Sequence, residues 1–221
     1  MDWLAAVLQA RLAEYFGASG PDAAAALAGL PPPPLAGDPS DLAALLAEHG
    51  LDAPEARLVL ALALAPHLRP PLLDPLFVRN TNLDRGFAEF GGAKGRAHGG
   101  FLPTGETAAF LLCGSDLARR FALARLFDER HAFRAHGLLS LQLDAPGEPP
   151  WAGALVASAE LLDRLTSGER HKPDYSAGFP ARLITTHLGW DDLVLAPEVM
   201  AEVEGLRTWL AHERRLMQDW G

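Results

Sequence analysis

The hydrophobic positions near the N-terminus of this chain recur every three or four residues. This period predicts an amphipathic helix over residues 2–16. Its apolar positions are Trp3, Leu4, Val7, Leu8, Leu12, Tyr15 and Phe16. A second helix is expected after Ser40, a good N-cap, and before Gly50. A third begins near Pro54 and runs through Leu64; it is apolar on nearly all sides, which is typical of a helix at the centre of a core.

Proline and glycine divide the next part of the chain. Residues 31–34 are four prolines, which favour an extended, semi-rigid spacer. Pro66 is expected to end the third helix, because proline lacks the N–H that a helix interior needs. Residues 79–103 are rich in glycine and polar residues and predict one long loop. Two helices then follow, over residues 105–112 after Thr104 and over residues 116–127 after Ser115.

A strand signal appears only in the second half of the chain. Residues 138–143 alternate between apolar and polar, and residues 151–156 can return as the second strand of a hairpin. A helix capped by Ser158 and ended by Gly168 follows, and a last helix is expected from Glu198 to Trp220. The predicted class is mainly α with a small β-hairpin. The order of elements predicts a winged-helix-like domain over 51–175. An N-terminal helical segment with a Pro-rich spacer (1–50) precedes it, and a linker with a lead-in helix (176–221) follows it.

Composition adds limits to this picture. The 221 residues carry a net charge of −9, which argues against non-specific nucleic-acid binding by the whole chain. The charge is uneven, because residues 57–140 hold eleven basic and seven acidic side chains while both flanking regions are acidic. The N-terminus lacks the basic region of a secretory signal, and no stretch is long enough to span a bilayer. With a single cysteine, Cys113, the chain is expected to be cytoplasmic with a buried thiol.

The glycine-rich run is the first candidate site. Glycines allow backbone N–H groups to approach a ligand, and basic side chains between them supply charge. The predicted partner-binding residues are Gly91, Gly92, Lys94, Gly95, Arg96, His98, Gly99 and Gly100, with Arg119 and Arg120 from the helix that follows. A phosphate or carboxylate site remains open, and so does a loop that orders against a protein partner.

Residues 100–107 copy the spacing of a phosphate-binding loop, but Glu106 stands where the lysine belongs. A carboxylate there would repel a nucleotide phosphate. We therefore interpret Thr104 and Glu106 as the cap and the favourable first-turn charge of a helix. The eight histidines show no metal-ligand spacing, and no motif of a nucleophilic hydrolase is present. The sequence predicts no catalytic, cofactor-binding or metal-binding residues.

Three segments together suggest a family. They are Leu58–Pro66, Phe90–Thr107, and Phe179–Leu195 with the closing stretches Leu206–Leu210 and Gln218–Gly221. In these segments the chain resembles the N-terminal region of AAA+ ATPases encoded with extracellular contractile injection systems, the phage-tail-like particles of the antifeeding-prophage type. The resemblance covers residues 55–221 and is most specific in the second segment.

The resemblance implies a winged-helix-type domain that feeds a hexameric ATPase, which is thought to serve particle assembly or cargo loading. The partners would be an injection-system component or cargo protein and an AAA+ core in cis. ATP and Mg would belong only to the full-length relative, because these residues contain no Walker A, Walker B or arginine finger. This chain alone is therefore expected to be a non-catalytic recognition or regulatory domain. The alternative is a winged-helix DNA-binding protein that uses either the Thr104–Leu112 helix or the arginine-bearing helix in the major groove.

Overall fold

The computed structural model describes residues 1–17, 30–82, 84–143, 145–168, 189, 192 and 194–219, with the side chains of the last helix described to Trp209 and at His212. The chain forms two compact units, Met1–Lys172 and Pro173–Gly221. Within the described residues the fold is mainly helical with two small two-stranded antiparallel sheets, which confirms the predicted class. None of the described helices is both long and apolar enough to cross a membrane.

The first unit contains seven described α-helices and four 3-10 helices. The α-helices are α1 (Asp2–Tyr15), α3 (Asp41–Glu48), α4 (Pro54–Leu68), α5 (Gly105–Cys113), α6 (Leu117–Ala124), α7 (Ala132–Ala135) and α8 (Ala159–Thr166). The 3-10 helices are η1 (Pro70–Phe77), η2 (Ala88–Phe90), η3 (Arg125–Phe127) and η4 (Pro150–Ala152). The sheets pair β1 (Arg79–Asn80) with β2 (Arg85–Gly86), and β3 (Leu139–Gln142) with β4 (Ala154–Ala157).

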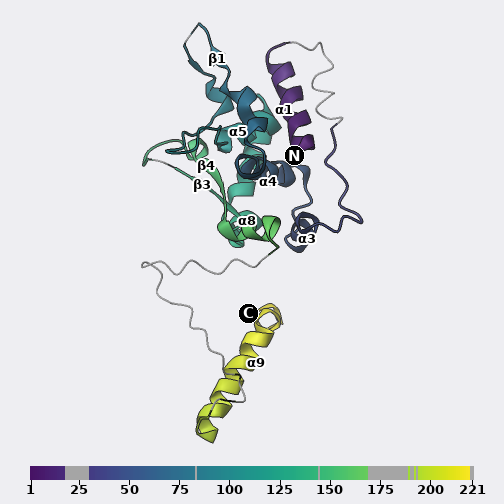
Figure 1. The fold of residues 1–221 in the computed structure, drawn as a ribbon, viewed down its shortest axis with the longest axis vertical. Helices are drawn as coiled ribbons and strands as arrows, with labels where there is room; N and C mark the ends of the chain where they lie inside the picture. Colours follow the sequence, from purple (N-terminus) through teal and green to yellow (C-terminus); the bar gives the residue numbers. More distant parts are fainter. Residues whose placement is uncertain are drawn as a thin grey trace. The chain divides into compact units, whose positions relative to one another are not determined.

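Helix α4 lies in the interior of this unit, as the sequence predicts. Figure 1 shows α1, α5 and the β3–β4 hairpin around it, and α4 contacts each of these neighbours. Its buried residues are Ala56, Leu58, Val59, Leu60, Leu62, Ala63, Leu64 and Ala65. Residues of α1 and α3, including Leu4, Leu8 and Leu45, belong to the same hydrophobic cluster. The N-terminal helices therefore complete the core of the unit that contains the glycine-rich segment.

The structure corrects the predicted end of α4. The helix continues through Pro66 to Leu68, and the Arg69 N–H still donates to the Ala65 carbonyl at 2.9 Å. A proline inside a helix costs about 3 kcal/mol, whereas each fully buried leucine contributes about 1.5–3 kcal/mol. Since Leu62 and Leu64 lie in the core, their packing outweighs one lost hydrogen bond.

Two other predictions from local pattern need correction. The helix after Cys113 begins with Asp116 as its cap, not Ser115, because the Asp116 carboxylate accepts from the Arg119 N–H at 3.1 Å. The prediction of one long loop over 79–103 is wrong, because the stretch contains β1, β2 and η2. By contrast, the predicted caps at Ser40, Thr104 and Ser158 are confirmed.

Candidate functional site

The glycine loop, defined as residues 91–102, is closed at its base. It begins directly after η2 and ends just before the cap of α5. The Ala93 N–H donates to the Leu102 carbonyl at 2.9 Å, and these two residues form an isolated antiparallel bridge. Residues 94–99, which we call the loop tip, lie between the two bridged positions.

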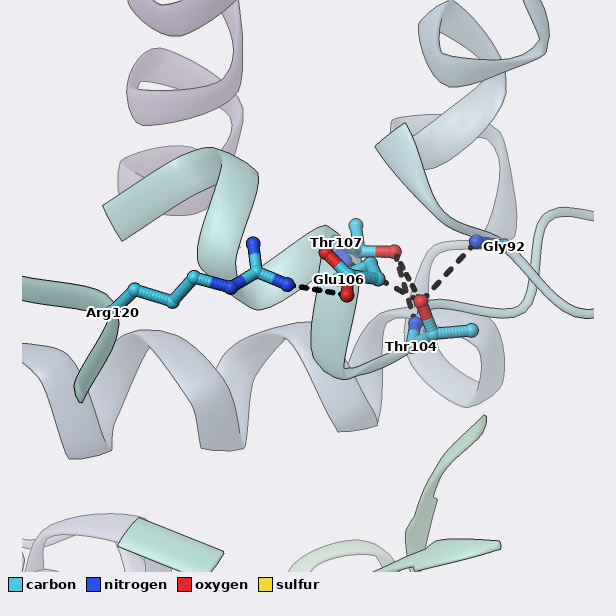
Figure 2. Close-up of polar contacts among 5 residues, drawn as sticks. All are labelled: Gly92, Thr104, Glu106, Thr107 and Arg120. Carbon is cyan, nitrogen blue, oxygen red and sulfur yellow. Dashed lines mark hydrogen bonds and ion pairs between the residues drawn. The ribbon is translucent and has the colours of Figure 1, made fainter. Parts of the chain in front are cut away.

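A buried threonine pair holds the base of this loop to α5 (Figure 2). Thr104 and Thr107 form a capping box, in which the Thr104 N–H donates to Thr107 Oγ1 at 2.9 Å and the Thr107 N–H donates to Thr104 Oγ1 at 3.4 Å. The Gly92 N–H also donates to Thr104 Oγ1, at 3.3 Å, and the Thr107 hydroxyl donates to the Phe90 carbonyl at 2.8 Å. Both threonine side chains are buried, so their hydroxyls anchor the backbone of Phe90 and Gly92 to the start of α5.

Gly91 and Gly92 are required by this packing. Gly91 has φ +64°, and a Cβ there would lie 2.3 Å from Thr104 Oγ1. Gly92 has φ +98°, and a Cβ there would lie 2.6 Å from the Phe101 ring. Only glycine combines such backbone angles with so close an approach. The role of these two glycines is therefore to close the loop base.

The loop tip is different in character. Lys94, Arg96 and His98 are exposed, and within the part of the chain that the structure describes no hydrogen bond or ion pair involves their side chains. The His98 ring lies over Gly100, where a Cβ would come 2.6 Å from Nε2. A Cβ at Gly99 would meet nothing within 4 Å. The structure thus brings three of the predicted partner-binding side chains together on one short exposed segment.

The predicted arginine pair divides between two roles. Arg120 forms an ion pair with Glu106, and its guanidinium lies 4.6 Å from the centre of the Trp151 ring (Figure 2 shows the ion pair). It therefore ties α6 to the start of α5 and to the hairpin. Arg119 is exposed on the same helix. Two apolar residues of α6, Leu117 and Phe121, are also exposed, at 66% and 72%.

The hairpin supports the loop base from the other side. The Leu155 N–H donates to the Pro103 carbonyl at 2.8 Å, and the Gly105 N–H donates to the Gly153 carbonyl at 3.2 Å. Gly105 approaches so closely that a Cβ would lie 3.0 Å from the Trp151 backbone. The start of α5 is therefore held between the glycine loop and the β3–β4 hairpin.

Charged groups of opposite sign stand at the two ends of α5. Glu106 lies in its first turn, and Arg11, which is 7% exposed, donates from Nε and Nη2 to the Leu111 carbonyl at 3.1 and 3.0 Å. Both placements are favourable, because a helix carries partial positive charge at its N-terminus and partial negative charge at its C-terminus. Arg11 also pairs with Glu14, so its buried charge is neutralised.

A pocket of about 380 Å³ runs beside α5. Its lining residues are Arg11, Glu14, Tyr15, Glu89, Glu106, Phe110, Gly114, Ser115 and Arg120. Burial raises the pKa of Tyr15, and the neighbouring Glu89 carboxylate raises it further. The pocket draws on separate segments of the chain, and no spacing in the sequence signals it. A second pocket, of about 490 Å³, lies between α1, α3, α4 and α8 and has mostly apolar walls.

The resemblance to a phosphate-binding loop at residues 100–107 has a structural explanation. Thr104 caps α5 and Glu106 supplies the first-turn charge, as the sequence interpretation proposes. Within the described residues no group of three His, Cys, Asp or Glu side chains is placed to hold a metal ion. The segment Phe179–Thr186 and residues Trp190, Asp191 and Leu193, which carry much of the AAA+ resemblance, lie outside the described residues.

No protein-family model, no curated protein and no solved structure matches this chain.

Proposed function

We propose that this chain is a non-catalytic recognition domain of an AAA+ ATPase that serves assembly or cargo loading of a contractile injection system. The tip of the glycine loop would contact the partner, which is a particle component or a cargo protein. The observation that carries the proposal is the contrast within one loop. Its base is held by a buried and a partly buried hydrogen bond, and its basic tip is exposed.

A closed base is useful for recognition because it lowers the entropy lost on binding. A flexible loop must be ordered when it binds, which costs free energy for each immobilised residue. Here the Ala93–Leu102 bridge and the threonine pair already order both ends. The tip then presents Lys94 and Arg96 to an acidic partner surface, where charge complementarity favours encounter and register. In this proposal ATP and Mg act only in the AAA+ core of the full-length protein, and the chain works in the cytoplasm.

Two observations favour a protein partner over DNA. Arg120, one of the arginines of the helical region that could contact DNA, is held by Glu106 and Trp151. The same helix exposes Leu117 and Phe121, and exposed apolar side chains suit a protein interface better than a phosphate backbone. The order of α5, α6, α7 and the β3–β4 hairpin is also compatible with the winged-helix arrangement that the family resemblance implies.

Charge reversal at the tip tests this function. Deleting residues 91–100 would remove Gly91 and Gly92 and so disturb the fold, whereas the double variant Lys94→Glu/Arg96→Glu changes only the tip. The matched control is Arg85→Glu/Arg130→Glu, which makes the same charge change at two exposed arginines elsewhere. The tagged full chain and both variants serve as bait for the proteins encoded beside its gene.

The expected result is that the wild-type chain and the control capture a tail, baseplate or cargo protein. The tip variant should bind that protein at least about tenfold more weakly. Circular dichroism should show all three proteins equally folded. Equal capture by the tip variant would contradict the assigned role of the loop. A salt-sensitive shift of duplex DNA by the wild-type chain, without protein capture, would favour the DNA-binding alternative.

A further inference from the structure

Helix α9 (Pro197–Asp219) is the longest described helix and forms most of the described part of the second unit. At 1.5 Å per residue its 23 residues span about 34 Å. Figure 1 draws it as one continuous helix. In proteins most of the stability of a helix comes from packing an apolar face and not from helix propensity.

Four apolar residues in the N-terminal part of α9 have the spacing of a heptad repeat, which Glu213 interrupts at the next d position. Val199, Val203, Leu206 and Leu210 are spaced four, three and four residues apart, which places them at positions d, a, d and a. Val199 is 44% exposed and Leu206 is 64% exposed. Val203 is half-buried. The residues Ala201, Glu204, Gly205 and Thr208, which are small or polar, occupy the opposite face.

The charges beside the stripe indicate which surface fits it. Glu202 occupies a g position and Arg207 the e position of the following heptad. In a parallel pair of identical helices these two positions face each other across the seam, so each Glu202 meets the Arg207 of the second copy. An antiparallel pair would instead set the charged e residues, Arg207 and Arg214, against each other. The charge pattern therefore complements itself in the parallel orientation only.

The side chains at the seam also favour a small number of strands. A β-branched residue at position a, followed by leucine at position d, favours two-stranded parallel coiled coils. Val203 and Leu206 supply this combination in the middle of the repeat, whereas Val199 at d and Leu210 at a have the reverse one. Arg207 also pairs within its own helix with Glu204 at 2.7 Å.

We propose that α9 is a self-association helix, through which two copies of this chain form a parallel two-stranded coiled coil. This interface goes beyond the recognition role proposed above, because it uses a different unit and a different partner. The coiled coil would link two recognition domains in one dimer. Two linked binding sites raise avidity when both can engage the same particle.

The test measures the mass of the full chain by sedimentation equilibrium over a range of concentrations. The expected species is a dimer of the 23.6 kDa chain that dissociates on dilution. Leu206→Asp places a charge in the seam and should weaken the dimer by more than about 30-fold. Thr208→Asp introduces the same charge on the opposite face of the helix and should leave the dimer intact. A monomer at every concentration, a trimer, or a dimer that survives Leu206→Asp would overturn the proposal.

A charge-reversal cycle tests the parallel orientation. Glu202→Arg and Arg207→Glu should each weaken the dimer by about 3- to 10-fold, because two attractive pairs become repulsive. The double variant restores opposite charges across the seam and should recover most of the affinity. It does not restore the pair between Arg207 and Glu204 within one helix, so recovery reports on the contact between copies. Additive weakening in the double variant would contradict the parallel arrangement.

Discussion

The base and the tip of the glycine loop use the same residue type for opposite purposes. At the base, Gly91 and Gly92 allow the backbone to approach Thr104 and Phe101 more closely than any side chain permits. At the tip, a Cβ at Gly99 would meet nothing within 4 Å. Packing therefore fixes Gly91 and Gly92, and His98 crowds Gly95 at the tip, whereas Gly99 leaves the backbone unconstrained beside exposed basic side chains. A glycine-rich stretch is thus a mixture of structural and functional positions that only their neighbours distinguish.

The largest expected difference in stability is between substitutions at Gly91 and at Gly99. Gly91→Ala should destabilise the first unit by about 2–4 kcal/mol, because it adds both an unfavourable positive φ and a clash with Thr104. Gly99→Ala should change the stability by less than about 0.5 kcal/mol. Urea unfolding, followed by circular dichroism, measures both. Equal stability of the two variants would show that the base does not constrain Gly91.

The threonine pair offers the next largest effect. Thr107→Val keeps the shape of the side chain but removes the hydroxyl that donates to the Phe90 carbonyl and accepts from the Thr104 N–H. Two buried polar groups then lose a partner, which should cost about 2 kcal/mol. Thr166→Val is the matched control, because the Thr166 hydroxyl donates to the Leu162 carbonyl at an exposed site. Thermal unfolding should separate the two variants by several degrees; indistinguishable midpoints would mean that the pair does not stabilise the base.

The smallest expected effect is a pH dependence of stability that comes from His131, the capping residue of α7. Burial lowers the pKa of His131, and the Asp128 carboxylate opposes this shift only in part. His131 Nδ1 accepts from the Phe133 N–H at 3.3 Å as the cap of α7, which requires an unprotonated ring nitrogen. The folded state therefore binds this proton more weakly than the unfolded state, and stability should fall as the pH drops below about 6.5.

Urea unfolding at neutral and mildly acidic pH measures this loss. His131→Asn keeps a capping acceptor without a titrating group and should reduce the pH dependence. An unchanged pH dependence in His131→Asn would assign the effect to other groups.

Predictions from sequence succeeded where a local rule was sufficient. The threonine and serine caps of α3, α5 and α8 follow from residue type and spacing, and so does the β3–β4 hairpin. They failed where tertiary packing outweighed the local preference. Pro66 remains inside α4 because its neighbours are buried in the core. The β1–β2 hairpin is only two residues long on each side and has no hydrophobic alternation to reveal it.

The candidate site shows the same division. The basic residues of the loop tip are visible in the sequence as Lys94, Arg96 and His98 between glycines. The contacts of Arg120 with Glu106 and Trp151 are not visible in the sequence, because those partners are 14 and 31 positions away along the chain. The same holds for the pocket beside α5, which joins α1, η2, α5 and α6. The T-G-E-T stretch that begins at Thr104 could have revealed the second capping threonine, Thr107.

The sequence alone determined the helical character of this protein, the caps of α3, α5 and α8, the β3–β4 hairpin and the basic composition of the glycine loop. These features depend on backbone preferences and on periodicity over a few residues, so local information is enough. Only the tertiary structure decided which glycines close the loop and which arginine is engaged, and it also decided how the start of α5 is held. Those outcomes depend on contacts between residues that are distant in the chain, and no local pattern encodes which distant groups will meet.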